Sequence, residues 1–144
     1  MAKVNAVCVS IEKGTVKTEV PEIELCVSHG IKGDAHAGDW HRQVSLLGDE
    51  SVEKMRAHFP YLPPCAFAEN ILTEGLTLYE LPIGTRLRVG EALLEITQIG
   101  KECHEACAIG RITGDCVMPR EGVFAVVLEG ATVRAGDEIT EVQP

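Results

Sequence analysis

The chain is short of basic residues and has no long apolar run, and both absences limit what it can bind. Its 144 residues include 13 lysines and arginines against 22 acidic residues, a formal net charge of −9. Because no long basic stripe offsets the repulsion from phosphate, we expect no nucleic-acid partner and no membrane partner. No window approaches the ~18 apolar residues of a membrane span, and the N-terminus shows no cleavage pattern. We therefore expect a cytoplasmic protein that holds any anionic ligand by local positive charge.

The sequence also lacks repeats, low-complexity tracts and linkers, which favours a single domain over residues 1–144. Its hydrophobic content of 45% is sufficient for one core. Since a secretory signal is missing, the six cysteines are expected to be reduced thiols and not a disulfide framework. Cys8 in VNAVCVSI and Cys26 in ELCV fit as small apolar core residues.

Short alternating segments dominate the pattern and predict strands joined by tight turns. The first is a hairpin formed by residues 4–11 and the segment TVKTEV. Residues 85–99 form the clearest hairpin, with Gly90-Glu91 suited to a type II′ turn. A helix is predicted from Glu50 to His58, ended by a proline cluster. Further strands are expected in VSLL, AENILTEG and GVFAVVLEGATVRAGDEITEV. The pattern indicates a mostly β (α+β) fold, an antiparallel β-barrel with one or two short helical insertions.

Three cysteines lie close together in GKECHEACAIGRITGDCVMPR, residues 100–120. With His104, the thiols of Cys103, Cys107 and Cys116 could supply four ligands to zinc or to part of an iron–sulfur cluster. The spacing is poor for this, because only Cys103 and Cys107 form a close pair, so no structural metal is expected. A disulfide between those two would require distortion if they face each other across a helical turn.

Cys103 is the better candidate for a reactive thiol. It follows the predicted hairpin directly, after Gly100 and Lys101, at a strand-to-helix junction. A helix N-terminus and Lys101 would both favour the thiolate, whereas Glu102 would oppose it. Cys107 and Cys116 could then serve as resolving thiols, and for Cys107 packing on a helix face is an equal alternative.

A second group of polar residues lies in the glycine-rich segment SHGIKGDAHAGDWHRQ, residues 28–43. Arginine or protonated histidine beside exposed backbone N–H groups makes a phosphate or oxyanion cradle. The alternative is that the histidines pin the loop and that Asp34 caps a turn. The candidate cofactor-binding residues are Lys32, Asp34, His36, His41 and Arg42, with Arg120 downstream.

The order of these blocks resembles the MOSC domain, which is found at the C-terminus of eukaryotic molybdenum cofactor sulfurases and as small standalone bacterial proteins. The blocks are GIKGDAHAG, RQVSLL, AENILTEGL, LPIGTRLRVGEALLEITQIGKEC and EGVFAVVLEGATVRAGDEI. The resemblance implies a β-barrel and one characteristic cysteine, by position Cys103, that carries sulfur as a persulfide or ligates molybdenum. It also implies that the loop around His36 and Arg42 lies near a pterin phosphate.

The function implied by this resemblance is a molybdenum-cofactor-associated sulfur carrier or molybdopterin-binding protein. Its partners would be a pyridoxal-phosphate-dependent cysteine desulfurase, or a molybdoenzyme or cofactor-biosynthesis protein. The better-known enzymatic members carry an N-terminal barrel extension and an appended redox domain that this sequence does not show, so we do not expect an independent oxidoreductase activity. A sulfurtransferase-type activity stays open. The alternatives are a regulatory module that binds the cofactor or an oxyanion without catalysis, and a zinc-stabilised structural domain.

Overall fold

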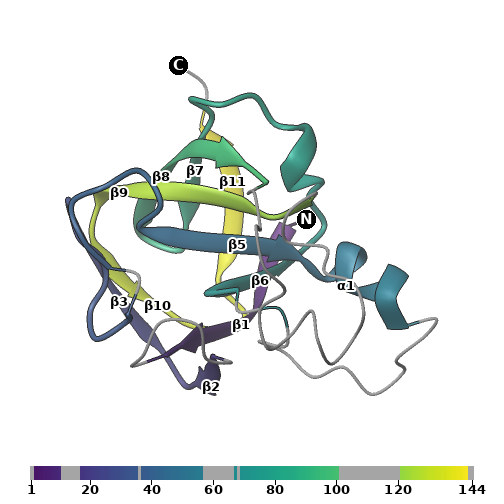
Figure 1. Cartoon of the computed structure of the whole chain (residues 1–144), viewed down its shortest axis with the longest axis horizontal. Coiled ribbons are helices and arrows are strands. Elements are labelled where there is room, and N and C mark those ends of the chain that lie inside the picture. The colour runs from purple at the N-terminus through teal and green to yellow at the C-terminus, as the bar shows by residue number, and fades with distance from the viewer. Residues whose placement is uncertain are drawn as a thin grey trace, which may run out of the picture.

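Seven strands of the described chain close into a barrel (Figure 1). The computed structural model describes residues 2–10, 17–35, 37–56, 67, 69–100 and 121–142. Around the barrel the strands follow the order β11-β7-β8-β9-β5-β6-β1, and β1 pairs with β11 to close it. A short strand, β2, extends the sheet beyond β1. The bounds are β1 (Ala2–Val9), β2 (Thr18–Val20), β5 (Val44–Gly48), β6 (Ile71–Glu74), β7 (Arg86–Val89), β8 (Ala92–Ile99), β9 (Val123–Glu129) and β11 (Glu138–Val142).

The predicted β-barrel is confirmed, with a correction to the strand orientation. All described pairings in the barrel are antiparallel except β5–β6, which is parallel. Parallel neighbours need a crossover connection, and helix α1 (Asp49–Arg56) begins directly after β5 in that connection. Its buried apolar residues are Val52 and Met55. A single turn of 3₁₀ helix, η1 (Leu78–Glu80), follows β6.

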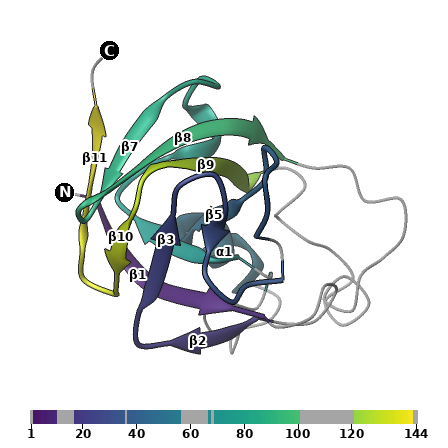
Figure 2. The same ribbon diagram turned by 90° about the vertical axis from the view of Figure 1, so that its left-hand side faces the viewer.

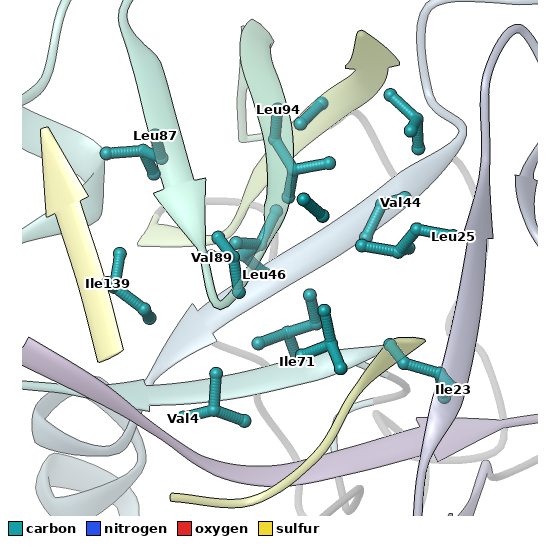
Figure 3. Close-up of a cluster of buried hydrophobic side chains, with 14 of the residues drawn as sticks. Val4, Ile23, Leu25, Val44, Leu46, Ile71, Leu87, Val89, Leu94 and Ile139 are labelled. Atoms are coloured by element: carbon teal, nitrogen blue, oxygen red, sulfur yellow. The ribbon is translucent and has the colours of Figure 1, made fainter. Parts of the chain in front are cut away.

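A small second sheet covers one side of the barrel. It has the order β10-β3-β4, from β3 (Ile23–Cys26), β4 (Gly30–Ile31) and β10 (Ala131–Val133). Its apolar side chains are buried in the same cluster as those of the barrel, and Figure 3 shows Ile23 and Leu25 beside Val44 and Ile71. The described chain therefore has a core shared by both sheets, which stabilises the fold mainly by removing apolar surface from water.

The two predicted hairpins are confirmed. In the first, β1 pairs with β2 through Val7 and Val20. In the second, β7 and β8 are joined at Val89 and Ala92, and Gly90 has a φ of 58°. A side chain at Gly90 would be strained by this φ and would also meet the Asp137 carboxylate, 2.8 Å from an ideal Cβ.

Two described cysteines lie in strands, Cys8 in β1 and Cys26 in β3. Cys26 is free and half-buried, whereas Cys8 is fully buried and disulfide-bonded. The expectation of reduced thiols is therefore wrong for Cys8. Composition and strand periodicity predict that Cys8 is buried, but they carry no information on which thiols meet in the fold.

A buried ion pair holds the middle of the glycine-rich segment, at Asp34, against the end of β1. Lys17 Nζ lies 2.8 Å from Asp34 Oδ1, and the side chains are 1% and 0% exposed. The same Asp34 oxygen accepts a hydrogen bond from the Ser10 backbone N–H at 3.0 Å. Ala35 adds a backbone hydrogen bond to the Ser10 carbonyl at 2.7 Å. These contacts fix the segment before it reaches His41 and Arg42.

We expect Asp34→Ala to destabilise the protein by about 3–5 kcal/mol, because it removes the carboxylate that lies 2.8 Å from the buried Lys17 ammonium. The double variant Lys17→Met/Asp34→Leu should lose less than Asp34→Ala alone, since it removes both buried charges together. Urea unfolding followed by circular dichroism measures both. Lys32→Met, which breaks an exposed ion pair with Glu24, is the matched control and should cost about 1 kcal/mol or less. A cost for Asp34→Ala as small as that of the control would contradict the stabilising role.

Candidate functional site

The end of β8 lies beside the start of β9, where Ile99 pairs with Val123 (Figure 2). The Gly100 N–H donates to the Gly122 carbonyl at 2.7 Å, which joins two residues that flank the cysteine-bearing segment, residues 101–120. The side-chain amide of Gln98 donates to the Gly100 carbonyl at 2.7 Å. The base of the cysteine-bearing segment is therefore fixed by hydrogen bonds on both sides of Gly100.

Side chains at this end of the β8–β9 pair form a platform. Gln98 and Phe124 are directly opposite each other in the β8–β9 register. Residues paired in this way project from the same face of an antiparallel sheet, with Cβ atoms about 4.5–5.5 Å apart. The register shifts between Ile96 and Gln98, so Thr97 is an extra residue, and its hydroxyl oxygen lies 3.2 Å from the Phe124 carbonyl oxygen.

The segment 40–42 docks on this platform. His41 Nε2 lies 2.8 Å from Gln98 Oε1, and the Arg42 guanidinium carbon lies 5.4 Å from the centre of the Phe124 ring. The Thr97 hydroxyl also donates to the His41 carbonyl. Two adjacent residues of the glycine-rich segment thus contact the two residues of one cross-strand pair.

Backbone contacts bring the segment into this position. Gly30 has a φ of 112°, and an ideal Cβ placed on it would lie 2.6 Å from the Gln43 carbonyl oxygen. Only glycine permits both that conformation and that approach. Gly38 donates to the His29 carbonyl at 2.6 Å, and Gln43 Oε1 accepts from the Val127 N–H at 3.0 Å. The segment folds back on its own start and is tied to β9 at its end.

The Arg42 guanidinium lies close to two aromatic rings. Its carbon is 4.7 Å from the centre of the Trp40 ring as well as 5.4 Å from that of Phe124, and both distances fall in the cation–π range. Its Nε is buried and has no hydrogen-bond partner in the described part of the chain. The His41 ring meets Trp40 edge-on at 5.9 Å. We call this group the aromatic corner: Trp40, His41, Arg42, Gln98 and Phe124.

Arg42 differs in its charge pairing from every other described lysine and arginine. Each of the others lies within 4.0 Å of a carboxylate oxygen, whereas Arg42 has no such partner among the residues that the structure describes. Asp39, a near neighbour in the chain, is exposed and forms no ion pair with it. In a protein with a net charge of −9, an arginine without a carboxylate partner is a local site of positive charge available to an anion.

The hydrogen bonds of Gln98 determine the tautomer of His41. Gln98 Nε2 donates to the Gly100 carbonyl, an acceptor, so the amide oxygen faces His41. An amide oxygen only accepts, and therefore neutral His41 carries its proton on Nε2. Its Nδ1 is the remaining acceptor and makes no hydrogen bond to the described residues.

The structure brings together His41 and Arg42 among the predicted cofactor-binding residues. Lys32 has a 75% exposed side chain and lies 3.7 Å from Glu24 on β3. Asp34 is buried against Lys17, a position that supports the loop and leaves its carboxylate inaccessible to a ligand. The remaining predicted residues lie outside the described part of the chain, namely His36, Cys103 and Arg120.

Three members of the aromatic corner are absent from the residues predicted to bind a ligand. Trp40 is the only tryptophan of the chain and stands in a polar, glycine-rich segment, which is a signal that the sequence does offer. Gln98 and Phe124 carry no comparable signal, because each lies in an ordinary strand pattern. Their role follows from the register of β8 against β9.

A second group of polar residues holds the chain where it re-enters the barrel. Glu121 Oε1 accepts from the Ser51 hydroxyl at 2.7 Å and from Lys54 Nζ at 2.9 Å. Lys54 also donates to the Tyr79 hydroxyl at 3.4 Å. These residues line a small hollow between α1 and η1. Glu121 thus ties the end of the cysteine-bearing segment to α1.

The described residues contain no group of three or more histidine, cysteine, aspartate and glutamate side chains placed to hold a metal ion. Within the same residues, no helix has the length and apolar character needed to cross a membrane.

The family model for the MOSC domain matches residues 33–140, which include the aromatic corner and both ends of the cysteine-bearing segment. The chain belongs to the MOSC domain family. No curated protein sequence matches it.

Solved structures share the fold of this MOSC protein at low sequence identity. The YuaD protein of Bacillus subtilis is 20% identical with a TM-score of 0.79, over 96% of this chain and 93% of that one. YiiM of Geobacillus stearothermophilus is 16% identical with a TM-score of 0.73, over 99% of this chain and 76% of that one. YiiM of Escherichia coli is 22% identical with a TM-score of 0.69, over 100% and 71%. These likenesses establish a common barrel.

We predict that Arg42→Met changes the emission of Trp40, because it removes a charge 4.7 Å from the ring centre of the only tryptophan. The variant should also lose about 0.5–2 kcal/mol of stability from the cation–π contacts. Fluorescence spectra and urea unfolding measure the two effects. The control is Arg134→Met, which removes an exposed arginine paired with Glu22. Identical tryptophan spectra for wild type and Arg42→Met would contradict the stacked geometry.

Lys54 gives a prediction for alkaline pH. Its pKa is raised above the ordinary value of 10.5, first by the hydrogen bond to Glu121 and then by that to Tyr79. A raised pKa in the folded state contributes stability that is complete below the unfolded-state pKa and is lost as pH rises through the folded-state pKa. When the pH is raised from below to above 10.5, the free energy of unfolding should therefore fall less for Lys54→Met than for wild type. Parallel losses in the two proteins, measured by urea unfolding, would show that this contact does not stabilise the fold.

Proposed function

We propose that this MOSC protein binds a molybdopterin-type cofactor through an anionic group at Arg42 and handles its sulfur or molybdenum through Cys103. The observation that carries the proposal is the placement of Arg42. It has no described carboxylate partner, and it lies on the strand pair from which the cysteine-bearing segment leaves. Membership of the MOSC family supports the cofactor class.

The residues of the aromatic corner fit the phosphate of such a cofactor. A guanidinium presents planar, paired donors to phosphate oxygens, and stacking on Trp40 and Phe124 limits its rotation. The His41 ring, next in the chain, adds a second polar contact. Molybdenum would supply a soft metal centre that binds thiolate, and Cys103 is the proposed ligand from this chain. Lys32, His36 and Arg120 are proposed as further contacts to the cofactor.

As a sulfur carrier, Cys103 would act by thiol–disulfide exchange chemistry. Its thiolate attacks the outer sulfur of a persulfide on a cysteine desulfurase. A new S–S bond forms on Cys103, the S–S bond of the donor breaks, and the electron pair leaves with the donor's cysteine thiolate. The step needs no separate oxidant or reductant. A molybdoenzyme or a cofactor-biosynthesis protein would accept the sulfur, and the reaction would be of sulfurtransferase type in the cytoplasm.

The test of this proposal is sulfur loading. Incubation with a cysteine desulfurase and cysteine should add one sulfur to wild-type protein and none to Cys103→Ser, because that variant lacks the attacking thiolate. Intact-protein mass spectrometry measures the adduct. Cys107→Ser is the matched control and should load like wild type.

Two results would contradict the assignment to Cys103. One is loading of Cys103→Ser at the wild-type level while Cys107→Ser fails. The other is the absence of both sulfur loading and bound molybdopterin in wild type purified from its native cell.

A second candidate function is a regulatory module that binds the cofactor or an oxyanion without catalysis. The favouring observation is that the described parts of the aromatic corner come from segment 40–42, β8 and β9 and include no thiol. This candidate predicts that phosphate titrated against Trp40 fluorescence binds equally before and after alkylation of the free thiols. Loss of binding on alkylation would favour the sulfur carrier.

A further inference from the structure

We propose that Gln98 is a positioning residue that makes the anion site selective for a ligand carrying an acid proton, such as a monoprotonated phosphate. The inference rests on the proposed anion site at Arg42 and adds the protonation state of its ligand. It concerns selection between tetrahedral oxyanions that share charge and shape. The contact that selects is His41 Nδ1.

Two contacts orient the Gln98 amide. Its Nε2 donates to the Gly100 carbonyl at 2.7 Å, and its Oε1 lies 2.8 Å from His41 Nε2. Reversing the amide would place an N–H against the ring nitrogen and a carbonyl oxygen against the Gly100 oxygen. Two oxygen acceptors would then face each other, so the amide has one favourable orientation.

The orientation of the Gln98 amide fixes the tautomer of the neutral His41 ring. Because Gln98 Oε1 accepts from His41, the neutral ring holds its proton on Nε2 and presents Nδ1 as an acceptor. The Thr97 hydroxyl donates to the His41 carbonyl and so fixes the backbone that carries the ring. Nδ1 itself makes no hydrogen bond to a described residue. The ring therefore offers a ligand one acceptor and no donor.

The His41 ring and the Arg42 guanidinium belong to one group of contacts. Gln98 holds the His41 ring and Phe124 stacks under the Arg42 guanidinium, and these two platform residues are cross-strand neighbours on one face. Trp40 contacts both His41 and Arg42. His41 and Arg42 are adjacent in the chain and share the contact with Trp40, and on this basis we place an anion bound at Arg42 beside the Nδ1 acceptor.

This geometry distinguishes oxyanions by their protonation. Near neutral pH inorganic phosphate keeps at least one O–H, and a phosphate monoester is partly protonated near pH 6. Sulfate and molybdate have no O–H at neutral pH and would place an oxygen lone pair against Nδ1. Sites built to hydrogen-bond a ligand O–H reject analogues without it, because a polar partner is left unpaired.

The experiment compares inorganic phosphate with sulfate by isothermal titration calorimetry near neutral pH. Wild type should bind phosphate about tenfold or more tightly than sulfate, from the cost of one unmatched polar contact. Gln98→Leu should bring the ratio close to one, because either ring tautomer is then available.

Gln98→Glu should reverse the preference. A carboxylate beside His41 Nε2 stabilises the doubly protonated ring, which turns Nδ1 into a donor suited to sulfate. If Gln98 had a purely structural role, its variants would weaken the binding of both anions together and leave the ratio of the two affinities unchanged. Arg42→Met locates the site, and it should abolish binding of both anions.

Three results would overturn the inference. If wild type binds sulfate as tightly as phosphate and Arg42→Met abolishes both, the anion site is real and the selectivity is wrong. If the Gln98 variants keep the wild-type ratio, Gln98 does not set it. If Arg42→Met binds both anions as tightly as wild type, the proposed function loses its anion site and the inference fails with it.

Discussion

The pairing of Gln98 with Phe124 across β8 and β9 is the constraint on which the candidate site depends. Paired residues share a face of the sheet, so the amide that orients His41 and the ring that carries Arg42 lie side by side. A shift of the register by one residue would place one of them inside the barrel. The Gly100–Gly122 hydrogen bond, two residues beyond this pair, joins the same end of the two strands.

Barrel closure makes this register rigid. Each of β8 and β9 has a strand on both sides, so neither presents a free edge that could slip or pair elsewhere. The shared core beneath them is apolar, as Figure 3 shows for Leu46, Leu94 and Val89. The site is therefore carried by a fixed scaffold, and the chemistry is left to side chains at one end of the barrel. This arrangement resembles the way many folds present functional residues on segments between rigid strands.

The sequence predicts the local features of this protein well and its long-range contacts poorly. Alternation and turn residues are enough to locate the β7–β8 hairpin, because every determinant lies within a few residues of Gly90. Composition is enough to single out the polar, glycine-rich segment that carries Arg42. It does not separate Arg42 from Lys32 or Asp34, whose partners Glu24 and Lys17 approach through the fold. The parallel β5–β6 pair and the disulfide-bonded state of Cys8 depend on tertiary contacts in the same way.

A crystal structure of the protein grown with inorganic phosphate is the most direct test of the central claim. The claim is that Arg42 is reserved for an anion next to the cysteine-bearing segment. We predict phosphate oxygens within hydrogen-bond distance of the Arg42 guanidinium, which stays stacked on Trp40 and Phe124. Arg42 paired with a carboxylate of the protein, with no phosphate at the aromatic corner, would contradict it.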